Sequence, residues 1–174
     1  MHNETHRSVT GEQFGLEIPA DPAGLRDGAA RFLTDAFRAS GVLADGNAVT
    51  SVTAFREVAG GSTGRKVALS IEYDKPRPGL HTDLFVKFSR DLDNPTRDWG
   101  KTQMEPEVRF ASLPRAPGLP IAVPAVQFAD YDRRTGTGIL ITERIPFGRS
   151  GSNANTTNAS TTRCPTPSSI TARC

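Results

Sequence analysis

Residues 58–67 read Val58-Ala-Gly-Gly-Ser-Thr-Gly-Arg-Lys-Val67, a glycine-rich stretch between two segments with strand character. From Val67 to Tyr73, apolar residues alternate with small or polar ones, which is the period-two pattern of a half-buried β-strand. Residues 49–58 are rich in β-branched and aromatic side chains, which favour strands. We therefore predict a β-hairpin whose turn lies at residues 59–64.

A third strand follows at residues 83–89. Its alternation places Leu84, Val86 and Phe88 on one face and Lys87 on the other. A charged residue between apolar neighbours either faces solvent or needs a partner, because an unpaired buried charge is costly. The strand alone leaves both readings of Lys87 open.

The remaining elements follow from the same kinds of pattern. An amphipathic helix of about five turns is expected at 22–41, after the capping residue Asp21. Residues 90–103 are expected to be irregular. A second helix is expected from Glu105 to about Leu113, and two further strands at 123–128 and 138–143, after the proline-rich connector 114–124. The predicted class is α+β: a five-stranded antiparallel sheet with one inserted helix and one N-terminal helix.

The charge is unevenly distributed along the 174 residues. The chain has 21 Lys and Arg against 19 Asp and Glu, a net charge of +2. Residues 1–148 carry 18 of the basic and all 19 acidic residues, a net charge of −1, whereas residues 149–174 carry three arginines and no acid. The body of the chain also lacks the interleaved aromatic and basic residues of single-strand binders, so no nucleic-acid partner is expected.

Composition divides the chain into three parts. Residues 1–20 are expected to be a loose N-terminal segment, residues 21–148 a folded lobe, and residues 149–174 a disordered tail with too little apolar surface to fold. Our hypothesis for the tail is an out-of-frame reading of a GC-rich gene; the alternative is a natural disordered extension. Its cysteines, Cys164 and Cys174, match no metal-ligand spacing.

Neither a membrane nor a secretory address is expected. No run approaches the roughly 20 apolar residues that span a bilayer. The first seven residues lack the apolar core of a signal peptide, so a cytoplasmic location is the default expectation.

The glycine-rich turn is the first candidate for chemistry. Backbone N–H groups in such a turn can approach phosphate oxygens without obstruction by side chains. Gly64 is followed by Arg65 and Lys66 rather than by Lys-Ser/Thr, so the turn is not a Walker loop, and a strand follows it where a dinucleotide fingerprint requires a helix. Taken alone, such a turn is more often purely structural.

Lys87 is the second candidate. A lysine that grips nucleotide phosphates needs a carboxylate to steady it, and Glu107 on the following helix is available. Glu105 is the nearest rival, but it precedes Pro106 at the expected helix cap.

Together these features resemble the ATP-binding N-lobe of the protein-kinase-like phosphotransferases, in particular the aminoglycoside phosphotransferase, choline kinase and ecdysteroid kinase branch. The resemblance covers roughly residues 22–148. It is carried by Phe55-Arg-Glu-Val-Ala-Gly-Gly-Ser-Thr-Gly-Arg-Lys-Val67, Leu84-Phe-Val-Lys-Phe88, Glu107-Val-Arg-Phe110 and Gly138-Ile-Leu-Ile-Thr-Glu-Arg-Ile145.

The resemblance implies a role for each matching residue. Lys87 would contact the α- and β-phosphates of ATP, held by Glu107. The residues over the phosphates would be Gly60, Gly61, Ser62 and Gly64, and the hinge beside the adenine would be Thr142, Glu143, Arg144 and Ile145. Val67 and Val86 are candidates for the apolar walls around the adenine.

The resemblance also implies parts that are not found in the sequence. Such enzymes need a second lobe with a catalytic aspartate in a His-x-Asp loop, an asparagine shortly after it, and a further aspartate for Mg²⁺. His81-Thr-Asp83 mimics the loop but precedes the third strand and lacks the asparagine, while Asp130 and Asp132 are expected at a turn.

We therefore expect a truncated phosphotransferase that keeps the nucleotide-binding lobe, with no catalytic residue and no metal ligand of its own. Its intact relatives would transfer the γ-phosphoryl group of ATP to the hydroxyl of a small molecule that the sequence does not identify. The alternative is a non-enzymatic module that senses a nucleotide or binds a partner.

Overall fold

The structure is a computed structural model that describes residues 8–113 and 123–146. The expected disordered tail, the two hypotheses on its origin and most of the proline-rich connector lie outside the described residues.

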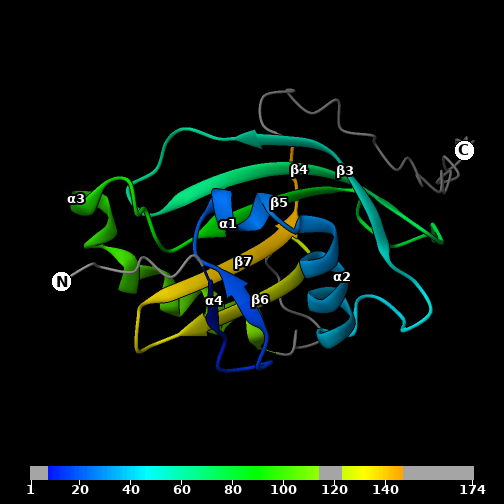
Figure 1. Cartoon of the computed structure of the whole chain (residues 1–174), viewed down its shortest axis with the longest axis horizontal. Coiled ribbons are helices and arrows are strands. Elements are labelled where there is room, and N and C mark those ends of the chain that lie inside the picture. Colours follow the sequence, from blue (N-terminus) through cyan, green and yellow to red (C-terminus); the bar gives the residue numbers. More distant parts are fainter. Residues whose placement is uncertain (1–7, 114–122, 147–174) are drawn as a thin grey trace, which may run out of the picture.

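Five strands form one antiparallel sheet, as predicted (Figure 1). Every neighbouring pair is antiparallel, in the order β3-β4-β5-β7-β6. The strands are β3 (Val49–Glu57), β4 (Arg65–Tyr73), β5 (Asp83–Phe88), β6 (Val126–Asp132) and β7 (Thr137–Glu143). The glycine-rich turn joins β3 to β4, and the α+β class with its inserted helix follows the expectation.

The prediction of one continuous N-terminal helix is wrong, because this segment forms two helices. Asp21 caps α1 (Pro22–Arg26) and accepts a hydrogen bond from the Gly24 N–H at 2.8 Å, but the helix ends at Asp27. After Gly28 the chain restarts as α2 (Ala29–Ala39). Glycine is the poorest helix former after proline, so a periodic apolar pattern can persist across a break at this residue.

The expectation of a loose segment at 1–20 is also wrong for its described part. β1 (Ser8–Thr10) and β2 (Glu17–Pro19) pair in antiparallel fashion, and Ile18 is fully buried. The Asp130 carboxylate on β6 accepts the N–H groups of Gln13 at 2.9 Å and Phe14 at 3.0 Å. Two strands of three residues are unstable alone, so this hairpin depends on contacts more than a hundred residues away.

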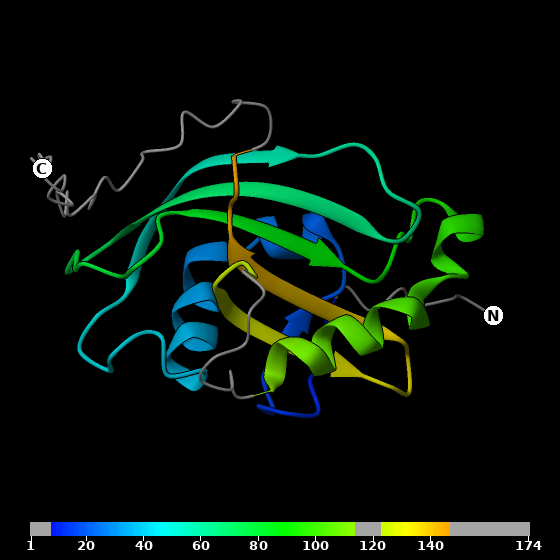
Figure 2. The ribbon, with the colours of Figure 1, turned by 180° about the vertical axis from the view of Figure 1, so that it is seen from behind.

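Residues 90–103 are not irregular throughout. They contain α3 (Pro95–Asp98) and the 3₁₀ helix η1 (Lys101–Met104), which runs into α4 (Glu105–Ser112). Asn94 caps α3 by accepting from the Arg97 N–H at 3.2 Å. Seen from behind, α4 lies across β6 and β7, on the side of the sheet opposite to α1 and α2 (Figure 2).

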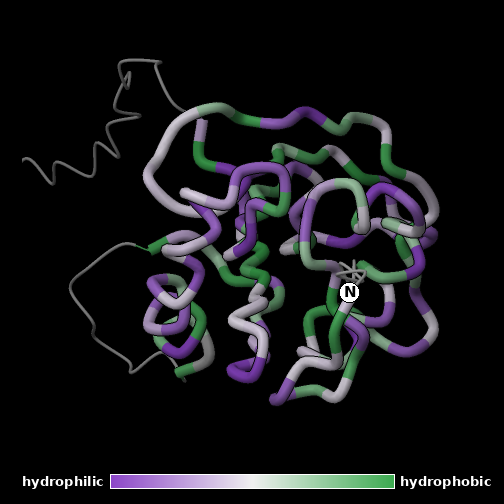
Figure 3. Tube along the Cα trace, turned by 60° about the vertical axis from the view of Figure 1, so that its left-hand side comes forward, coloured by the Kyte–Doolittle hydropathy of each residue, from purple (hydrophilic) through white to green (hydrophobic). Residues whose placement is uncertain are grey.

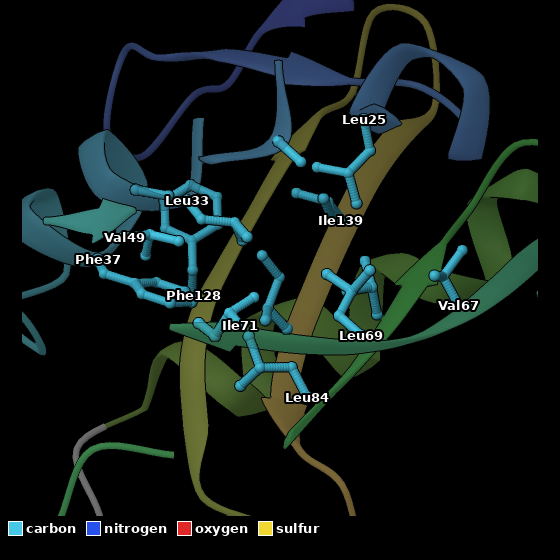
Figure 4. Packing of buried hydrophobic residues seen from close by; sticks show 14 of the residues in the cluster. Leu25, Leu33, Phe37, Val49, Val67, Leu69, Ile71, Leu84, Phe128 and Ile139 are labelled. Carbon is cyan, nitrogen blue, oxygen red and sulfur yellow. The ribbon is translucent and has the colours of Figure 1, made fainter. Parts of the chain in front are cut away.

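The alternation of residues along the strands, visible as colour changes in Figure 3, gives the sheet two packed faces. The larger core lies under α1 and α2, where Leu25, Leu33 and Phe37 meet strand residues such as Leu69 and Ile139 (Figure 4). A smaller cluster on the other face packs α4 against the sheet; its members are Met104, Val108, Ala129, Tyr131 and Leu140. Full burial of each large apolar side chain contributes about 1.5–3 kcal/mol.

Within the described residues, none of the helices has the length and apolar character needed to cross a membrane.

Candidate functional site

Lys87 and Glu107 form an ion pair on the α4 side of the sheet. The pleat of β5 sends Leu84, Val86 and Phe88 into the larger core, which leaves Lys87 on the opposite face beneath α4. Glu107 stands in the first turn of α4, and the burial of Val108 holds that helix against the sheet. The structure thus brings together the two charged residues that the resemblance pairs.

Glu105 is engaged elsewhere. Its carboxylate accepts hydrogen bonds from Arg109 at 2.9 Å and from Arg133 at 2.9 Å. The Arg109 hydrogen bond is the main cause that lowers the pKa of Glu105 below its usual value. Glu105 therefore fastens α4 to the β6–β7 turn and does not compete for Lys87.

A cavity of about 890 Å³ lies between this face of the sheet and α4, and Lys87 and Glu107 both line it. Its walls are otherwise mainly apolar, with Ala68, Phe85 and Leu140 from three neighbouring strands. All four expected hinge residues line it as well: Thr142, Glu143, Arg144 and Ile145.

The two candidates for the apolar walls around the adenine do not face the cavity. Val67 and Val86 are fully buried in the larger core, away from the cavity. Side chains two residues apart on a strand share a face, so the position of Lys87 already indicates that Phe85 faces the cavity. Ala68 follows because it pairs with Phe85 across β4 and β5.

The segment expected as the hinge is hydrogen-bonded on both sides, to Ala125 before β6 and to Asp83 on β5. The N–H of Glu143 donates to Ala125 O at 2.8 Å and the N–H of Arg144 to Asp83 O at 3.0 Å. The Glu143 carboxylate accepts from the Ala125 N–H at 2.7 Å and lies 3.5 Å from His81 Nδ1. His81 and Asp83 thus support Glu143 and Arg144, and Asp83 also accepts a hydrogen bond from the Ser70 hydroxyl at 2.7 Å.

The glycine-rich turn needs its glycines. Gly60, Gly61 and Gly64 have φ values of 106°, 84° and 53°, in the left-handed region that other residues rarely adopt. A Cβ at Gly64 would overlap the Phe88 carbonyl oxygen, so the turn is closely packed on the end of β5. None of the expected turn residues is among those lining the cavity described above.

Lys66 is the residue that the sequence reasoning missed. It lies directly opposite Lys87 across β4 and β5, so both side chains project from the same face. Its Nζ donates to Gly60 O at 2.8 Å and to Thr63 O at 3.2 Å, inside the glycine-rich turn. Burial, followed by the neighbouring charges of Lys87 and Arg97, lowers the pKa of Lys66. The sequence did not reveal this pair, because the predicted hairpin is β3–β4, whereas the pair depends on the register between β4 and β5.

Arg97 is the third cation at this end. Its Nη2 donates to Gly64 O at 2.6 Å, and its Nη1 lies 3.4 Å from the Asp91 carboxylate. Arg97 thereby joins α3 to the end of the turn that packs on β5.

Within residues 8–113 and 123–146, no group of three or more His, Cys, Asp or Glu side chains could hold a metal ion. Asp130 and Asp132 instead form hydrogen bonds that hold the backbone in place. Asp130 anchors the N-terminal hairpin, and Asp132 accepts from the Arg134 and Thr135 N–H groups in the β6–β7 turn.

Comparison of the chain with family models, curated proteins and solved structures finds no match.

Proposed function

We propose that residues 21–146 are the nucleotide-binding lobe of a phosphotransferase-like protein, and that the lobe binds ATP between the sheet and α4. The observation that carries the proposal is the Lys87–Glu107 ion pair at the wall of a mainly apolar cavity. The side chain of Lys87 is a quarter exposed and that of Glu107 about half exposed, so the pair remains within reach of a ligand.

The two ends of the cavity differ in the way that a nucleotide requires. Next to Lys87, outside the cavity lining, Lys66 and Arg97 add positive charge against the nearby carboxylates of Glu107 and Asp91, which favours an anion. Along the rest of the cavity the walls are mainly apolar, with Arg56, Glu143 and Arg144 as the charged exceptions, and such a lining can hold a flat base. Phosphates would lie at the Lys87 end and the adenine toward the hinge.

The hinge would meet the adenine beyond Arg144. The N–H groups of Glu143 and Arg144 are already used in the sheet, and Pro146 has none. The N–H of Ile145 is therefore the backbone donor that we assign to the base edge.

Phosphoryl transfer would need groups beyond those described. When bound, Mg²⁺ would neutralise charge on the phosphates, but the described residues offer it no ready-made set of ligands. His81 and Asp83 are held behind the hinge, so we assign them no catalytic role. We propose nucleotide binding without turnover for these residues, and transfer to a small-molecule hydroxyl for phosphotransferases that also carry a catalytic lobe.

Calorimetric titration of the full chain with ATP tests the proposal. We expect sub-millimolar affinity that falls by at least about tenfold in Lys87→Met, since a charge-assisted hydrogen bond contributes about 1.5–3 kcal/mol. Lys75→Met is the matched control, because Lys75 also donates to a carbonyl, Gly46 O at 2.6 Å, but lies outside the cavity lining. Absence of binding by the unchanged chain, or equal loss in both variants, would refute the proposal.

A second candidate, a partner-binding module, is favoured by a different observation. Phe110, Leu113 and Ile145 line the cavity and remain between about half and two thirds exposed. Apolar side chains gathered in this way often mark an interaction surface. Retention of a protein partner by a chain that binds no ATP would favour this candidate.

A further inference from the structure

The cross-strand pair of Lys66 and Lys87 is a local conflict in the sheet. Like charges directly opposite on neighbouring antiparallel strands destabilise the pairing. Lys87 has the carboxylate of Glu107, whereas the hydrogen bonds of Lys66 go to two neutral carbonyls, Gly60 O and Thr63 O. Residues that break a local rule without such compensation are typical of functional sites.

The contacts of Lys66 also divide the glycine-rich turn into two parts. The C-terminal part of the turn is fixed, because Gly64 packs on the backbone of Phe88 and the Gly64 carbonyl accepts a hydrogen bond from Arg97. The Gly60–Thr63 part is held from inside by the Lys66 ammonium, and a Cβ at Gly61 would lie only 2.5 Å from Lys66 Nζ. Gly60 and Gly61, both with positive φ, allow this part to change its backbone conformation.

We propose that Lys66 is a phosphate-binding residue that closes the turn while the site is empty. When a polyphosphate binds, its oxygens replace the carbonyls of Gly60 and Thr63 as acceptors for the Lys66 ammonium. The exchange places an anion between Lys66 and Lys87, relieves their repulsion, and releases the Gly60–Thr63 backbone to lie over the phosphates. The role assigned to ATP here rests on the function proposed above, but the anion site itself does not.

An anion bound beside Lys66 would act against the causes that lower the pKa of Lys66 in the empty site. Burial, Lys87 and Arg97 all disfavour its charged form in the empty site. A phosphate oxygen beside it would favour the charged form, so ligand binding and protonation of Lys66 support each other.

The test compares three ligands on the full chain: ATP, adenosine and inorganic tripolyphosphate. In Lys66→Met we expect the affinities for ATP and tripolyphosphate to fall by about tenfold to a hundredfold, with adenosine affinity unchanged. Lys66→Arg should retain most of the affinity because it keeps the charge. Lys75→Met, which removes a lysine–carbonyl contact away from the site, should leave all three affinities unchanged.

Hydrogen exchange of the turn amides shows whether Lys66 binds phosphate or only stabilises the turn. In the ligand-free chain, Lys66→Met should speed exchange at residues 60–63. Faster exchange with unchanged tripolyphosphate affinity would overturn the proposal, because Lys66 would then only brace the turn. An equal fall in adenosine affinity would overturn it too, as a general effect on the lobe.

The outcome for the unchanged chain distinguishes the two proposals. Tripolyphosphate binding that depends on Lys66, without ATP or adenosine binding, would support the anion site and refute the nucleotide function. Binding of ATP that is insensitive to Lys66→Met would support the nucleotide function and refute the role of Lys66 in an anion site. If neither ATP nor tripolyphosphate binds, both proposals fail.

Discussion

Replacement of Gly64 by alanine is expected to destabilise the lobe strongly. The residue has a φ of 53°, where a side chain costs about 1–2 kcal/mol. An added Cβ would also overlap the Phe88 carbonyl oxygen and lie 2.8 Å from its carbon, and both are backbone atoms that cannot rotate away. Overpacking of this kind costs about 1–3 kcal/mol more. With about 0.4–1 kcal/mol recovered from the stiffer unfolded chain, the net loss is about 1–4.6 kcal/mol.

Gly41→Ala is the matched control. Gly41 has a similar left-handed conformation, with a φ of 76°, but a Cβ there would meet no atom within 4 Å. It should cost about 0–1.6 kcal/mol, because backbone strain is partly offset by the stiffer unfolded chain. Urea unfolding followed by far-UV circular dichroism measures both variants. Fluorescence is a poor alternative because Trp99 is 89% exposed in the folded lobe. Equal losses in the two variants would refute the close packing of the turn on β5.

Two further substitutions test how charged groups stabilise the lobe. Burial alone would raise the pKa of Asp98, but hydrogen bonds from Arg90 and from the Asp91 N–H outweigh it and lower that pKa below its ordinary value of 3.8. This stabilisation is present above pH 3.8 and is lost as the pH falls through the lowered folded-state pKa of Asp98. Asp98→Asn should therefore lower the free energy of unfolding in urea by about 1–3 kcal/mol at neutral pH, and should weaken the fall of that free energy with decreasing pH. An unchanged fall at acid pH would contradict this role of Asp98. Asp130→Ala should leave the N–H groups of Gln13 and Phe14 without their acceptor and speed hydrogen exchange over residues 8–20 more than over β4; uniform acceleration would instead indicate general destabilisation.

The sheet was predictable because its strands carry strong local patterns. Alternation from Val67 to Tyr73 and around Lys87 determines which residues are buried, and burial then determines which face carries the charge. The inserted helix was predictable as well, since Pro106 and the first-turn acids mark its start. The arrangement of Lys87 with Glu107 followed from these elements and from the family resemblance.

Other features depend on contacts between distant segments, which no local pattern reports. The N-terminal hairpin has too few residues for a strand signal and is held by Asp130 on β6. The position of Lys66 opposite Lys87 depends on the register across a long β4–β5 connection. The break at Gly28 interrupts a helix without interrupting its apolar pattern, so periodicity could not locate it.

The hydrogen bonds from the Gln13 and Phe14 amides to Asp130 affect how the chain folds during synthesis. The partners are 117 and 116 residues apart, so on the ribosome the first hairpin is made long before its acceptor exists. At about 5–20 residues per second, that interval is roughly 6–23 s. During that time Ile18, which ends fully buried, has no completed sheet to cover it. Nascent chains stalled before residue 126 should therefore bind chaperones, and chains that have released β7 should not.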